Sequence, residues 1–195
     1  MVGLKIAIVC FVALADMSGG EFVANVPETP TAVVETTTAP TEAPTTAAVV
    51  PTAPRAEGFV AYSIYGYTPP IEWQQYLYNE LAARGCGWFY PYAVCQVFQE
   101  SRWSQWSDNG RDFGITQQKG VYWQSRCAYY GIPGADIWDV YAQFKVFAGM
   151  MANFLYANNG DVGMALSCYY LGTGEYSAVY VNNVMAHWGA LEAIR

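Results

Sequence analysis

Apolar side chains recur at intervals of three and four positions from residue 71 onward, the spacing that places them on one face of an α-helix. The first run, residues 71–84, carries Trp73, Leu77 and Leu81 on such a face, and glycines follow it. Later runs have the same character. Together they predict helices over residues 71–84, 90–100, 121–130, 140–157, 162–171 and 177–191.

Residues with known preferences for helix ends mark several of these boundaries. Pro91 suits the first turn of the second helix, because an amide hydrogen is not needed there. Asp161 can cap the fifth helix with its carboxylate, and Gly172 breaks that helix. Between the second and third helices, a polar loop over residues 104–112 leads into residues 113–118, which we expect to form a short strand.

The pattern therefore indicates a mainly α fold of the α+β class, with a small sheet or extended loop after Glu100. The aromatic residues outline the folded part, because all seven Trp and all sixteen Tyr lie between Tyr62 and Trp188. Residues 58–195 can bury a core, and we expect them to form one domain.

The first residues have the features of a secretory signal peptide. In residues 1–15, Lys5 precedes the apolar run Ile6 to Ala15, which ends in the small-x-small sequence Ala13-Leu14-Ala15. The run is shorter than the roughly 20 apolar residues that span a bilayer. We therefore expect a secreted protein with no stable membrane insertion after cleavage. A buried N-terminal strand is the alternative.

Residues 16–57 are biased in composition. Between Pro27 and Pro54 the chain is Pro, Thr, Ala and Val with scattered Glu, and it has no aromatic residue. Such a segment cannot bury enough apolar surface to fold. We expect a disordered Thr/Pro/Ala-rich linker, which would act as a semi-stiff spacer.

The net charge of -7 argues against a nucleic-acid partner, because no basic patch is present to meet phosphates. Four cysteines remain once the signal is removed, and they permit two disulfides or four buried free thiols. These are Cys86, Cys95, Cys127 and Cys168. No CxxC pair exists and His187 is the single histidine, so we expect no metal and no cofactor. We expect a monomer.

Glu100 is the strongest candidate for chemistry. It ends the second predicted helix, and the helical repeat places Ala93 and Val97 on the same face. An apolar surrounding makes a carboxylate costly to ionise, so the pKa of Glu100 should rise. A carboxyl that stays protonated near neutral pH can protonate the leaving oxygen of a glycosidic bond.

Three short motifs follow Glu100-Ser101 along the chain, and their order is characteristic. Gly114-Ile115-Thr116-Gln117 comes first, then Ala165 to Gly174, with the sequence ALSCYYLGTG, and then Tyr180-Val181. This order resembles the soluble lytic transglycosylase family, which has a lysozyme-like fold. That family carries Glu-Ser, Gly-Leu-Met-Gln, Ala-Tyr-Asn-Ala-Gly and Tyr-Val in turn. The resemblance covers roughly residues 70–190.

The resemblance implies roles for individual residues. Glu100 matches the single catalytic acid and base, supported by Ser101. Substrate-binding positions are implied for Ser101, Gly114, Gln117, Tyr169 and Tyr180, with Gly114 allowing substrate to approach the backbone and Gln117 lining the sugar groove. Two positions depart from the family, because Thr116 replaces Met and Tyr170 replaces an Asn that can both donate and accept hydrogen bonds.

The resemblance also implies the substrate and the reaction. The partner is the glycan strand of peptidoglycan, so the resemblance also implies that the secreted protein is cell-wall-associated. Glu100 protonates the oxygen between N-acetylmuramic acid and N-acetylglucosamine, while the N-acetyl group of the substrate stabilises the positive charge. Glu100 then takes the proton of the muramic C6 hydroxyl, and a 1,6-anhydro sugar forms.

Other functions remain open. Asp112-Phe113-Gly114-Ile115-Thr116-Gln117 also resembles the Asp-Tyr-Gly-Ile-x-Gln of animal-type lysozymes, in which the Asp is a second carboxylate. A retaining hydrolase is possible if Asp112 lies about 5–5.5 Å from Glu100. We favour the transglycosylase, since the later segments fit it. A non-catalytic wall-binding module and a secreted adhesin on a Thr/Pro stalk are the remaining alternatives.

Sugar rings stack on aromatic faces, so exposed aromatic residues are candidates for substrate contacts. The candidates are Tyr122, Trp123, Tyr129 and Tyr130. At this density of aromatic residues, most of them must serve the core.

Overall fold

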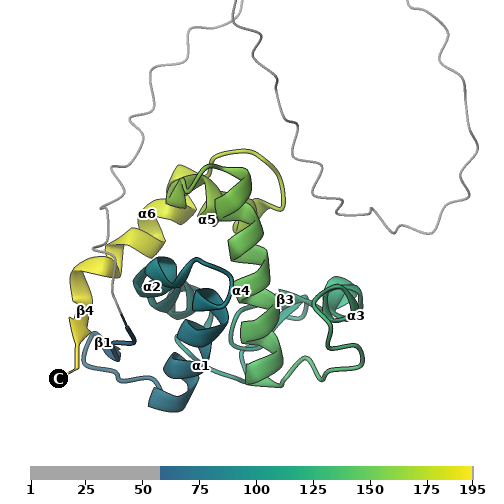
Figure 1. Ribbon diagram of the computed structural model, residues 1–195, viewed down its shortest axis with the longest axis horizontal. Coiled ribbons are helices and arrows are strands. Elements are labelled where there is room, and N and C mark those ends of the chain that lie inside the picture. The colour runs from purple at the N-terminus through teal and green to yellow at the C-terminus, as the bar shows by residue number, and fades with distance from the viewer. Residues whose placement is uncertain (1–57, 195) are drawn as a thin grey trace, which may run out of the picture. The chain divides into compact units, whose positions relative to one another are not determined.

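A computed structural model describes residues 58–194 of the chain (Figure 1). The predicted signal peptide, residues 1–15, and the predicted linker, residues 16–57, lie outside the described residues. Within residues 58–194, no helix is both long enough and apolar enough to cross a membrane.

The described residues are mainly helical, as expected. The α-helices are α1 (Ile71–Ala82), α2 (Tyr90–Ser101), α3 (Gly120–Tyr129), α4 (Val140–Ala157), α5 (Val162–Leu171) and α6 (Ala178–Ala186). Short strands are β1 (Tyr62–Ile64), β2 (Asp112–Phe113), β3 (Gln118–Lys119) and β4 (Leu191–Ala193). Two 3-10 turns, Gly87–Phe89 and Trp188–Ala190, precede α2 and β4.

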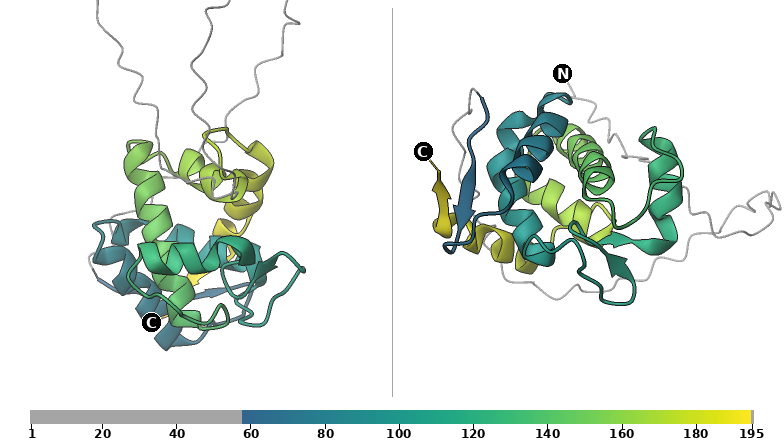
Figure 2. Two further views of the ribbon diagram at one scale, coloured as in Figure 1. Left: turned by 90° about the vertical axis from the view of Figure 1, so that its right-hand side faces the viewer. Right: turned by 90° about the horizontal axis from the view of Figure 1, so that it is seen from below.

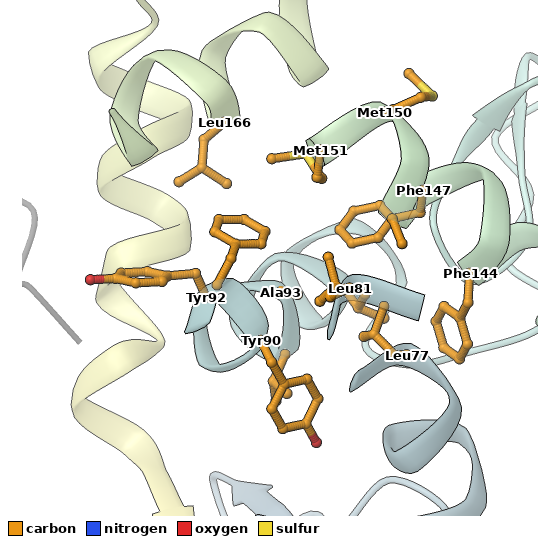
Figure 3. Close-up of a cluster of buried hydrophobic side chains, with 14 of the residues drawn as sticks. Leu77, Leu81, Tyr90, Tyr92, Ala93, Phe144, Phe147, Met150, Met151 and Leu166 are labelled. Atoms are coloured by element: carbon orange, nitrogen blue, oxygen red, sulfur yellow. The ribbon is translucent and has the colours of Figure 1, made fainter. Parts of the chain in front are cut away.

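Helix α2 lies at the centre of the core. Every residue from Tyr90 to Val97 is buried. Helix α4 contacts both α1 and α5, and the views in Figures 1 and 2 show it running between them. Figure 3 shows the resulting cluster, in which Leu77 of α1, Phe147 of α4 and Leu166 of α5 surround α2. Because its first two turns are enclosed, α2 holds its last turn, with Glu100, in a fixed place.

The last predicted helix is wrong at its C-terminal end. Helix α6 ends at Ala186, and Leu191 lies in strand β4. This strand pairs antiparallel with β1, and Leu191 is opposite Ile64. The two strands lie side by side at one edge of the domain (Figure 2). The apolar spacing could not reveal this pairing, because the partner strand is at the other end of the domain sequence.

The predicted strand over residues 113–118 is also wrong. These residues form a hairpin, in which Phe113 of β2 pairs with Gln118 of β3 and residues 114–117 make the turn. Gly114 (φ 74°) and Gln117 (φ 49°) both have left-handed backbone, which a continuous strand cannot contain. Residues 114–117, which carry part of the resemblance described above, therefore form a turn.

Of the two alternatives for the cysteines, the structure has buried thiols. Cys86, Cys95 and Cys127 are free and buried. Cys168 is buried as well, and its Sγ accepts a hydrogen bond from Asn158 Nδ2. Burial raises the pKa of Cys86 to about 11 and that of Cys95 to about 12, so both thiols stay protonated at neutral pH.

Candidate functional site

The chain reverses directly after Glu100. Arg102 (φ 54°) and Trp103 (φ 63°) are consecutive non-glycine residues in the left-handed region. Each costs about 1–2 kcal/mol, so the surroundings must hold this conformation. Trp103 is buried, and its Nε1 donates a hydrogen bond to the carbonyl oxygen of Val94 (3.2 Å), which lies about two helical turns before the reversal.

Ser101 links the end of α2 to the hairpin. Its hydroxyl donates a hydrogen bond to the carbonyl oxygen of Ile115 in the turn, at 2.7 Å. Ser101 thus fixes the hairpin against the helix that carries Glu100.

The Glu100 carboxyl receives a hydrogen bond from the far end of the domain. The hydroxyl of Tyr180, in the first turn of α6, donates to Glu100 Oε1. The same hydroxyl accepts a hydrogen bond from Gln96 Nε2, at 3.3 Å. Gln96 is fully buried and Tyr180 almost so, and the Oε1 of Gln96 has no partner. Because Gln96 donates to Tyr180, the single proton of Tyr180 is directed at Glu100.

The pKa of Glu100 is raised from its ordinary value to about 7. Burial of the carboxyl is the largest cause, and the hydrogen bond from Tyr180 opposes it by favouring the charged form. The negative charge of Asp112 raises the pKa further. Glu100 is therefore a mixture of acid and carboxylate at neutral pH, as the apolar face of its helix predicted.

Glu100 opens onto a cavity of about 220 Å³. The lining residues come from the ends of α2 and α5 and from α6; they are Gln99, Glu100, Tyr170, Ser177, Val179, Tyr180 and Asn183. Pockets for drug-sized ligands measure roughly 300–1,000 Å³, so this smaller cavity is suited to one ring or one substituent of a longer molecule. Neither Gln117 nor Tyr169 is among the lining residues.

Gln117 and Gly114 have internal roles in the turn. Gln117 Nε2 donates to the carbonyl oxygens of Ser107 (3.2 Å) and Gly114 (2.9 Å). A Cβ on Gly114 would lie 1.7 Å from Nε2 of Gln143. The space beside Gly114 therefore belongs to the buried Gln143 side chain and not to an approaching substrate.

Tyr169 lies against the hairpin of β2 and β3, with its hydroxyl bonded to two hairpin residues. Its hydroxyl donates to the carbonyl oxygen of Thr116 (2.5 Å) and accepts from Gln118 Nε2 (2.9 Å). Burial, and then the charge of Glu100, raise the pKa of Tyr169, so the two side chains are electrostatic neighbours. Tyr169 thus holds the turn near Glu100 without contacting the cavity.

Asp112 lies at the start of the hairpin and is mostly buried. Its Oδ2 accepts hydrogen bonds from Asn109 Nδ2 (3.2 Å) and Arg111 Nε (3.3 Å). Its Oδ1 is buried and has no partner. Asp112 is therefore close enough to influence Glu100 through its charge, although it does not line the cavity.

Three functional candidates were not identified from the sequence: Gln96, Gln143 and Asn183. Gln143 ties the hairpin to α4, because its Oε1 accepts from both the amide and the hydroxyl of Thr116 (2.8 and 2.9 Å). For Gln96 and Gln143 a signal existed, since a polar residue among the apolar positions of a helix is costly to bury unless it is hydrogen-bonded. Asn183 gives no such signal.

Within residues 58–194, no group of three or more His, Cys, Asp or Glu side chains could hold a metal ion. This chain has no match among protein-family models, curated proteins or solved structures.

Proposed function

We propose that the domain is a lysozyme-like lytic transglycosylase that cleaves the β-1,4 bond between N-acetylmuramic acid and N-acetylglucosamine in peptidoglycan. One observation carries the proposal. Glu100 has a pKa of about 7 and opens onto a cavity, where it is held by Tyr180. The motif order seen in the sequence supports the choice of substrate.

The chemistry needs one carboxyl used twice. Protonated Glu100 gives its proton to the bridging oxygen, and the bond from that oxygen to the anomeric carbon breaks. The N-acetyl group of the muramic sugar stabilises the positive charge. The Glu100 carboxylate then takes the proton of the C6 hydroxyl as that oxygen bonds to the anomeric carbon, which leaves a 1,6-anhydro ring and consumes no water.

Tyr180 fits both halves of this cycle. Its hydroxyl donates to Glu100 and so stabilises the carboxylate that forms when the proton leaves. Burial has the opposite effect and favours the acid that begins the cycle. A pKa near 7 is the compromise that suits a group which must give and take a proton in one turnover.

A hydrolytic muramidase is the second candidate. It is favoured by the buried, unpartnered Oδ1 of Asp112 and by the effect of that charge on Glu100. Two facts favour the transglycosylase. Asp112 Oδ2 already accepts from Asn109 and Arg111, and Asp112 is not among the residues that line the cavity.

Digestion of purified cell walls, followed by mass spectrometry of the released fragments, tests the proposal. Anhydro-muramic ends are expected; reducing ends with a water added would indicate the hydrolase. Glu100→Gln keeps the size of the side chain and its ability to accept from Tyr180, but it cannot supply a proton. Lysis should disappear while circular dichroism stays unchanged. Full lysis by this variant, or no lysis by the wild type, would contradict the proposal.

A further inference from the structure

The cavity at Glu100 has an aromatic wall that the motif comparison does not explain. Tyr170 lines the cavity and is 55% exposed. It is the position at which this chain departs from the Asn of the resembled family. An exposed aromatic ring in a cavity that also contains a buried acid suggests a contact for a ligand.

Tyr170 is held in a defined orientation. Its ring stacks on that of Tyr180, with the centroids 4.5 Å apart and the planes inclined by 6°. Tyr180 is buried and bonded to Glu100 at its hydroxyl. The stack therefore fixes Tyr170 relative to the acid, and little conformational entropy would be lost when a ligand binds to it.

The chemistry of the cavity suits a sugar ring. Tyr180 stacks on one face of Tyr170, and Tyr170 is nevertheless more than half exposed, which an open opposite face of the ring accounts for. Polarised C–H groups on one side of a pyranose match the negative face of an aromatic ring. The Asn183 side chain faces the same cavity and is exposed, so its amide can donate to and accept from sugar hydroxyl and N-acetyl groups. That amide supplies the hydrogen-bonding capacity that position 170 lacks.

We propose that the open face of Tyr170 is a stacking platform for one N-acetylated pyranose ring, with Asn183 as its polar partner. The inference rests on the proposed function for the identity of the glycan, and it adds where the sugar next to the cleaved bond is held. Tyr170 is therefore a substrate-binding residue that takes no part in the proton transfers.

Binding measured without turnover tests the platform. In the Glu100→Gln background, the tetrasaccharide of β-1,4-linked N-acetylglucosamine is titrated by calorimetry. Tyr170→Phe keeps the ring and should change Kd less than twofold. Tyr170→Leu keeps apolar cover over Tyr180 but has no aromatic face, so Kd should rise about five- to tenfold. Tyr156→Leu, another exposed tyrosine, on α4, is the control and should have no effect.

An unchanged Kd in Tyr170→Leu, an equal loss in the Tyr156 control, or no binding in the Glu100→Gln background would each overturn the platform. The Tyr170→Leu protein is compared with its parent by circular dichroism and thermal melting, and Tyr170→Asn provides a second variant without the ring. Lysis of walls together with unchanged binding would contradict the platform alone. Ring-dependent binding without any lysis would contradict the proposed enzyme and leave the platform standing.

Discussion

Tyr180 and Glu100 are 80 residues apart in the chain, and the hydroxyl of Tyr180 donates a hydrogen bond to Oε1 of Glu100. This contact joins α6 to the last turn of α2. It also makes the ionisation of Glu100 depend on how α6 is packed.

The lytic activity should require protonated Glu100 at the start of each cycle. With a pKa of about 7, kcat/KM should be level below pH 7 and should fall about tenfold per unit above it. The measurement is a rate profile on soluble glycan fragments, with circular dichroism at each pH as the control for folding. A rate that increases through pH 7 would show that Glu100 does not act first as an acid.

Glu100 should also make the fold less stable at higher pH. The pKa of the Glu100 carboxyl is 4.5 when it is free in solvent, as in the unfolded chain, and about 7 in the folded chain. Between pH 4.5 and 7 the folded chain therefore binds more protons than the unfolded chain. Stability falls as pH rises from about 4.5 to 7. At pH 4 we expect Glu100→Gln and the wild type to have the same midpoint of urea unfolding. At pH 8 the free energy of unfolding of Glu100→Gln should exceed that of the wild type by ~1–3 kcal/mol. Glu175→Gln, at an exposed carboxylate, is the control. Equal stabilities at pH 8 would contradict the burial of charge at Glu100.

Gln96 should determine which group receives the Tyr180 proton in the series of hydrogen bonds from Gln96 through Tyr180 to Glu100. In Gln96→Glu, a carboxylate replaces the group that donates to Tyr180, and it competes with Glu100 for the single Tyr180 proton. The falling limb of the rate profile should then move up by about one pH unit. Tyr180→Phe removes the hydroxyl that donates to Glu100, so it should also move the falling limb to higher pH. Gln96→Met keeps the Tyr180 proton for Glu100 and should move the limb less. A profile unchanged in all three variants would show that this chain does not tune Glu100.

Replacement of Gly114 by any residue with a side chain should lower the stability of the fold. A methyl group there meets both a left-handed backbone (φ 74°) and the Gln143 amide, whereas at Gly110 (φ 83°) nothing lies within 4 Å. Gly110→Ala measures the backbone cost alone, about 1–2 kcal/mol. Gly114→Ala should cost at least 1 kcal/mol more in chemical denaturation, because Gln143 must give up hydrogen bonds. Equal costs at the two sites would mean that Gln143 can move away freely.

Asp112 separates the two mechanisms. As a carboxylate that supports the hairpin, it can be replaced by Asn with most activity retained, since the amide oxygen still accepts from Asn109 and Arg111. A loss of about a thousandfold would instead indicate a second catalytic carboxylate and a hydrolase. The measurement is kcat on soluble glycan fragments, and the melting temperature of the variant separates lost chemistry from lost folding.

The sequence by itself determined the helices, apart from the C-terminal end of α6, because their signals are local. The repeat of Leu77 and Leu81 lies within one turn of α1, and the Asp161 carboxylate accepts from Met164 N three residues ahead (3.0 Å), as a cap should. Gly172 ends α5 with a left-handed backbone. The rise in the pKa of Glu100 was predictable for the same reason, since the apolar positions beside it are on its own helix.

Only the tertiary structure decided what surrounds Glu100. The Tyr180 hydroxyl, the Ile115 carbonyl that Ser101 contacts and the Tyr170 wall of the cavity come from distant parts of the chain. Their positions depend on how whole helices pack, which no short stretch of sequence encodes. For the same reason the local pattern of residues 113–118 predicts a strand where the structure has a hairpin. Gln143, which holds their turn, lies on α4 and is 27 residues beyond Thr116 in the chain.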